Sequence, residues 1–167
     1  EGKAGGYTLP DSVTSIGSFA FRDCTSLTGV TIPTSVTNIG DGAFSACTSL
    51  KRVYFQGNAP SVGSDVFTTT ENPTVYYWAG TTGWGSTYAC RPAVLWNPQV
   101  KTTAPSFGVR TNRFGFTITG TANIPLVVEA CTNVPSAVWL PLLSCTLTNG
   151  SIYFNDPQWT NYSKRFY

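Results

Sequence analysis

The strongest constraint on this chain is a 23-residue segment that occurs twice in succession. Residues 9–31 read LPDSVTSIGSFAFRDCTSLTGVT and residues 32–54 read IPTSVTNIGDGAFSACTSLKRVY, with 13 of the 23 aligned positions identical. A weaker third copy starts at Phe55 and keeps the apolar spacing through Val66 and Phe67. A fixed period of this length indicates a solenoid, in which each repeat buries its apolar side chains against its neighbours.

Each repeat contains one segment with the alternation of a β-strand. Val30 and Ile32 in the first copy, and Val53 and Phe55 in the second, stand two residues apart. Side chains at this spacing point to the same face of a strand. Pro33 then ends the strand, since proline cannot donate to a ladder of hydrogen bonds.

The full motif is I/LP-x-S-V-T-x-I-G-x-x-A-F-x-x-C-T-S-L-x-x-V, and it runs through residues 7–67. It closely resembles the BspA-type leucine-rich repeat, a family of bacterial and protist surface proteins. The resemblance implies a short leucine-rich-repeat solenoid with a face that binds a protein or a surface.

Aromatic residues dominate the segment that follows the repeats, residues 68–98. Adding 23 to Val53 and Phe55 gives Tyr76 and Trp78, so residues 74–78 are predicted to form the next strand. The segment is similar to the Trp-containing ending of BspA-type arrays, and Trp84 and Trp96 are large enough to cover the open end of a solenoid. An alternative interpretation is an aromatic ligand site made of Tyr76, Tyr77, Trp78, Trp84 and Tyr88.

Beyond residue 98 the 23-residue period is lost and a second domain is predicted. We expect residues 1–98 to form the repeats and their cap, 99–107 a linker, and 108–167 a small antiparallel β-sandwich-like domain. Phe114, Phe116 and Ile118 alternate with smaller residues, and Asn149-Gly150 predicts a hairpin between residues 139–147 and 152–154. This segment resembles a small β module at the C-termini of secreted bacterial repeat proteins. The predicted fold class is therefore mainly β.

The composition argues against several kinds of function. There is no histidine, which excludes mechanisms that depend on a histidine base or ligand. Most of the eight carboxylates fall at predicted turns, and no glycine-rich segment has the lysine of a phosphate loop. No cluster of Lys and Arg suits nucleic acid, and no run of about 18 apolar residues predicts a membrane span. We therefore expect a non-enzymatic protein without a cofactor or metal.

Charged residues make up only 11% of the chain, and Thr, Ser, Asn and Gly replace them, which favours an extracellular setting. The sequence starts partway through a repeat, so we expect a processed product or fragment of a longer precursor. Of five cysteines, Cys24 and Cys47 occupy equivalent core positions. Cys131 and Cys145 could form a disulfide across two strands.

Two functions remain. The leading hypothesis is a secreted or cell-surface protein, an adhesion or binding module whose variable strand positions contact a protein or cell-surface ligand; variation can also mean absence of constraint. The second is a structural subunit that assembles with its own copies into an extracellular filament or surface layer, because an uncapped repeat end invites head-to-tail contacts. The candidate partner-binding residues are Thr28, Thr31, Lys51, Arg52 and Tyr54. The candidate self-assembly residues are Tyr7, Leu9, Val13 and Ile16.

Overall fold

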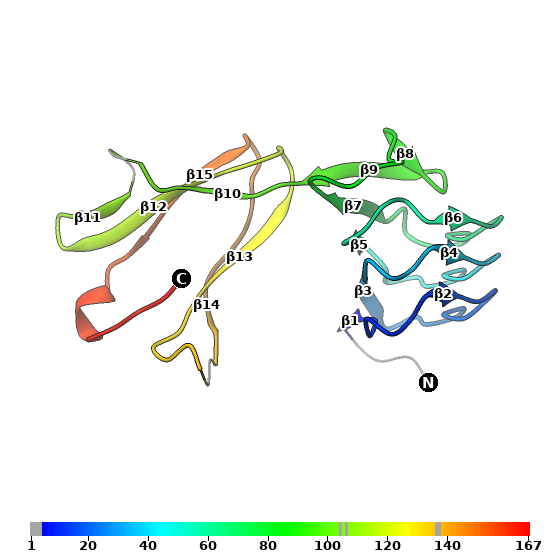
Figure 1. Cartoon of the computed structure of the whole chain (residues 1–167), viewed down its shortest axis with the longest axis horizontal. Helices are drawn as coiled ribbons and strands as arrows, with labels where there is room; N and C mark the ends of the chain where they lie inside the picture. The colour runs from blue at the N-terminus through cyan, green and yellow to red at the C-terminus, as the bar shows by residue number, and fades with distance from the viewer. Residues whose placement is uncertain (1–4, 104, 106, 136–137) are drawn as a thin grey trace. The chain divides into compact units, whose positions relative to one another are not determined.

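The computed structural model describes residues 5–103, 105, 107–135 and 138–167, and the chain divides into two compact units, Glu1–Trp96 and Asn97–Tyr167. Nearly all regular structure is β, as Figure 1 shows. In the described part of the chain the only helical element is a short 3₁₀ turn, η1 (Trp159–Asn161). None of the described helices is long and apolar enough to cross a membrane. The predicted mainly-β class is confirmed.

The first unit is a solenoid with two parallel sheets. One sheet runs in the order β1 (Gly5–Thr8), β3 (Leu27–Ile32), β5 (Arg52–Phe55), β7 (Thr74–Trp78) and β9 (Arg91–Trp96), with β8 (Thr87–Tyr88) antiparallel to β9. The other contains β2 (Ser15–Ile16), β4 (Asn38–Ile39) and β6 (Ser61–Val62). Each of the first three coils gives one strand to each sheet, so the coils stack in sequence order (Figure 1).

A turn segment forms the third side of each coil, and it repeats its hydrogen bonds from coil to coil. The Phe21 amide donates to the Ala43 carbonyl at 2.8 Å, and the Phe44 amide donates to the Val66 carbonyl at 3.0 Å. The rings of Phe21, Phe44 and Phe67 stack at centroid distances of 5.0 and 5.7 Å. Each coil therefore offers its neighbour the same donors, acceptors and aromatic surface.

The fourth coil departs from the period by one residue. Val53 pairs with Val75 and Phe55 pairs with Tyr77, a step of 22 residues. The prediction that Tyr76 and Trp78 take the inward positions is therefore wrong. Because side chains alternate along a strand, a one-residue shift exchanges the two faces.

The cap of the solenoid uses the inward aromatic residues. Tyr77 stacks on Trp84 with the rings 5.0 Å apart and almost parallel, at 5°. Trp84 and Tyr88 both pack on Phe55, at 5.0 and 5.3 Å. The Arg91 Nη2 donates to the Phe67 carbonyl at 2.6 Å. Rings and a guanidinium thus cover the last coil.

The second unit contains two antiparallel sheets. The first comprises β10 (Gln99–Lys101), β11 (Gly108–Arg110) and β15 (Ser151–Asp156), all paired with β12 (Arg113–Thr119). The second pairs β13 (Pro125–Ala130) with β14 (Leu140–Thr146). The segment expected to be a linker therefore supplies β10. The expected hairpin at Asn149-Gly150 is wrong, because β14 and β15 join different sheets and the turn connects them.

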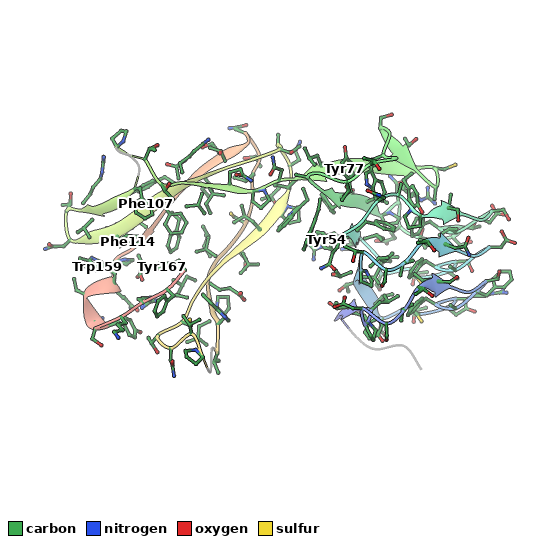
Figure 2. All side chains as sticks on the ribbon, in the orientation of Figure 1. Tyr54, Tyr77, Phe107, Phe114, Trp159 and Tyr167 are labelled. Atoms are coloured by element: carbon green, nitrogen blue, oxygen red, sulfur yellow. The ribbon has the colours of Figure 1, made fainter. Side chains whose placement is uncertain are left out.

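The last residues of the chain complete the core of the second unit (Figure 2). The Tyr167 ring stacks on Phe114 at 5.0 Å, and its hydroxyl donates to Asp156 Oδ2 at 2.9 Å. Arg165 Nε lies 2.9 Å from the same oxygen, and both side chains are at least nine-tenths buried. Phe166 and Cys131 exchange two backbone hydrogen bonds.

The expected disulfide between Cys131 and Cys145 is corrected by the strand register. Cys145 lies opposite Leu126 at one end of the β13–β14 ladder, whereas Cys131 follows Ala130 at the other end. Five strand residues separate the two positions, about 16 Å at the rise of a β-strand, far beyond the reach of a disulfide. Both thiols are free.

Candidate partner-binding site

The outward face of the parallel sheet holds the candidate partner-binding residues. Along β5, Val53 and Phe55 are buried, while Arg52 is exposed and Tyr54 half-buried. Arg52 lies beside Gly29 of β3 and Thr74 of β7. Because these neighbours are small, the guanidinium stands on an open part of the sheet.

Tyr54 belongs to a row of aromatic side chains that crosses the coils. Its ring stacks on Tyr76 of the next coil at 5.1 Å and 20°, and it meets the edge of Trp96 at 6.3 Å. Burial raises the pKa of both tyrosines, against a lowering effect of the Arg52 charge. Both hydroxyls are therefore protonated at neutral pH and can donate hydrogen bonds to a partner.

The remaining candidates lie on the same two strands. Thr31 pairs directly with Tyr54, and the Lys51 amide donates to the Thr28 carbonyl at 3.0 Å where the strands begin. Neither Lys51 nor Arg52 has an ion-pair partner among the residues that the structure describes. The structure thus brings all five predicted residues together and leaves two positive charges unneutralised beside an aromatic row.

The predicted aromatic cluster is divided between the two faces of the sheet. Tyr77, Trp84 and Tyr88 face the core, where they form the cap. Tyr76 and Trp78 face outward, and Trp78 is 40% exposed. Sequence reasoning missed Trp96 as a member of the outward row. The alternation of Val75 and Tyr77 around Tyr76 was the signal that could have found the division.

The candidate self-assembly residues lie at the first coil, where β1 and β2 each pair on one side only within the described chain. Leu9 and Ile16 are already buried against the second coil, at 4% and 2% exposure. Tyr7 and Val13 are half-buried and pack on the same core. The most exposed large apolar side chain here is Phe19, at 54%, which sequence reasoning did not select.

A stack of short strands with a conserved step and repeated turns is a leucine-rich-repeat solenoid. Residues 5–87 match the family model of the BspA type leucine rich repeat region (6 copies). The chain belongs, through these residues, to the BspA-type leucine-rich-repeat family, as its sequence motif predicted. Repeats of this family are protein-interaction modules of bacterial surface proteins and are generally non-catalytic. Comparisons with curated proteins and with solved structures gave no match.

Proposed function

We propose that the chain is a secreted or cell-surface adhesion module that binds a protein partner through the outward face of β3, β5 and β7. The main support is the pairing of Arg52 with an exposed edge of the Tyr54–Tyr76 stack. Arginine and tyrosine are the residue types that contribute most to protein interfaces, because they combine a large contact area with few, directional hydrogen bonds. An acidic or mixed acidic–aromatic protein surface complements this face.

The differences between coils support the same face. Gly29 and Thr31 of β3 are replaced by Arg52 and Tyr54 of β5 at paired positions, while the inward Val30 keeps its type in Val53. The fold does not require the outward residues, since the Gly29–Thr31 version occupies the same kind of strand. Recognition is therefore concentrated at the second and third coils.

The test is binding of the whole chain to a panel of purified extracellular matrix and cell-surface proteins, measured by biolayer interferometry. Arg52→Ala/Tyr54→Ala should weaken binding by roughly 100-fold, because each truncation of a central interface residue costs about 1–2 kcal/mol or more. The matched control is Phe19→Ala/Arg22→Ala, which also removes an arginine and an aromatic ring but from the turn side. Equal losses in both variants would contradict the proposal.

The second candidate function is self-assembly, and the first coil is the observation that favours it. The edges of β1 and β2 and the exposed Phe19 ring form one surface that a further coil from a second copy can cover. Light scattering over a range of concentrations tests this function. Growth in particle mass that Phe19→Ala/Arg22→Ala abolishes supports assembly, whereas a constant mass near 18 kDa contradicts it.

A further inference from the structure

The hairpin between β11 and β12 places two arginines side by side. Arg110 and Arg113 are directly paired across the strands, and the two residues between them, Thr111 and Asn112, both have left-handed backbones, with φ of 45° and 57°. Two successive left-handed residues define a type I′ turn, which matches the twist of the flanking strands. The two arginine Cβ atoms are therefore held about 5 Å apart on one face of the sheet.

This arrangement is unfavourable without an anion. Like charges directly opposite each other on an antiparallel pair destabilise it. Among the residues that the structure describes, neither guanidinium forms an ion pair with a carboxylate. Residues 97–167 carry five basic and two acidic side chains, and one acid, Asp156, is already buried in its pair with Arg165. The second unit thus has no spare internal charge at this place.

An aromatic platform lies next to the arginines. Gly115 is on the same face of β12 as Arg113, and a Cβ at this glycine would overlap the Tyr153 hydroxyl and ring of β15. The phenol end of Tyr153 therefore lies directly on the sheet over Gly115, and the side chain is still 46% exposed. One face of its ring is free to receive a flat ligand.

A polar side chain connects the platform to the charges. Arg113 Nη1 donates to Asn155 Oδ1 at 3.2 Å, which fixes the guanidinium and leaves the amide nitrogen of Asn155 as a donor. Arg110, Arg113, Tyr153 and Asn155 line an open cavity of about 690 Å³, together with Pro105 and Thr111. Pockets of this size hold a small molecule or one to two sugar rings.

We propose that this cavity binds an acidic saccharide, with the pyranose ring stacked on Tyr153 and its carboxylate or sulfate held by Arg110 and Arg113. Paired guanidiniums recognise such oxyanions through charge-assisted, bidentate hydrogen bonds. The apolar C–H face of a sugar matches the exposed ring, and Asn155 donates to a hydroxyl. The site lies in the second unit and does not depend on the partner-binding face of the repeats.

Calorimetric titration of the full chain tests the site with four probes: a hexamer of galacturonate, a sulfated hexasaccharide, neutral maltohexaose and hexaglutamate. We expect the two acidic saccharides to bind at least about tenfold more tightly than maltohexaose and hexaglutamate. The stronger of the two identifies carboxylate or sulfate as the preferred anion. Absence of binding at millimolar concentrations, or hexaglutamate binding as tightly as the saccharides, overturns the proposal.

Two variants separate a built site from diffuse positive charge. Arg110→Gln/Arg113→Gln should reduce saccharide affinity by about tenfold or more, while the control Lys101→Gln/Lys164→Gln, which removes the same charge elsewhere in the unit, should change it less than about threefold. Tyr153→Leu should weaken the saccharides selectively. Equal losses in the charge variant and the control overturn the site. Arg110→Gln should also melt no lower than the parent chain, since it relieves the like-charge pair.

Discussion

The two units of this chain close their cores in different ways. In the repeat unit, Phe21, Phe44 and Phe67 each contact the ring of the next coil, and every contact has a counterpart one repeat away. In the second unit, Phe114 and Asp156 depend on Tyr167, the last residue of the sequence. The comparison teaches that stability is distributed along the repeats but concentrated at a single closure in the second unit.

The largest effect is expected from removal of Arg165–Tyr167. The deletion takes away the ring stacked on Phe114 and leaves Asp156 as a buried, uncompensated charge, a loss of several kcal/mol by either mechanism. We expect the second unit to unfold at room temperature while the repeat unit remains folded. Hydrogen exchange followed by mass spectrometry reports the two units separately.

The control for this deletion is Tyr167→Phe, which keeps the ring and loses only the hydrogen bond to Asp156. It should leave the second unit folded. Protection of residues 97–167 that survives the deletion would show that closure is not concentrated at the C-terminus.

The next largest effect is expected from Phe44→Ala in the repeat unit. Phe44 is fully buried between two stacked rings, so its loss should cost about 3–5 kcal/mol in the free energy of unfolding, measured by urea denaturation. Because the coils support one another, exchange should increase in the coils of Phe21 and Phe67 as well. An increase confined to one coil would contradict distributed stability.

The two units should also differ in alkaline solution. Burial raises the pKa of the Cys47 thiol from 9.0 to about 11, so the folded repeat unit holds this proton more tightly than the unfolded chain. The stabilisation is complete below pH 9 and is lost as the pH rises to about 11, by about 2–3 kcal/mol. Urea denaturation between pH 8 and 11 measures this loss, and Cys47→Ala should remove its first part.

In the second unit the corresponding group is Tyr167, whose pKa is raised by burial and by the neighbouring Asp156. Its contribution should remain intact up to about pH 10, the ordinary pKa of tyrosine, and fall above it. Tyr167→Phe should flatten that fall. Simultaneous loss in both units near pH 9 would show that Cys47 does not account for the difference.

The smallest effect concerns Gly42. Its backbone is left-handed at φ 58°, but Phe19 and Asp65 adopt φ of 58° and 54° at the equivalent positions, so this conformation alone does not require glycine. A Cβ on Gly42 would overlap the Phe19 ring. We expect Gly42→Ala to cost about 1–2 kcal/mol in thermal or urea denaturation. In a Phe19→Ala background the cost should fall below about 1 kcal/mol, and a double-mutant cycle measures the difference.

The repeat unit could be predicted from sequence because its interactions recur with the period of the letters. The strands of the first three coils, the inward residues such as Val30 and Val53, and the closeness of Arg52 to Tyr54 all follow from that period. The prediction failed at Tyr76, where the step shortens to 22 residues. A rule of constant spacing cannot detect a shortened coil, whereas packing can, since Val75 and Tyr77 fill the inward positions better.

The second unit was predictable only in part. Alternation located β12 around Phe116, but neither the destination of β15 nor the role of Tyr167 leaves a local pattern. The turn at Asn149-Gly150 exists, yet its flanking strands pair with partners more than 10 residues away. The Arg110–Arg113 pair was overlooked because each arginine, taken alone, is an ordinary surface residue.

The hydrogen bonds between coils have a genetic consequence. Each turn segment donates to the following coil and accepts from the preceding one in the same way, as Phe21 with Ala43 and Phe44 with Val66 show. A duplication or deletion of one complete 23-residue block therefore leaves every junction chemically unchanged. Recombination between the near-identical copies can lengthen or shorten the repeat unit in whole coils, and its outward residues can then diverge while the aromatic cap and the second unit stay intact.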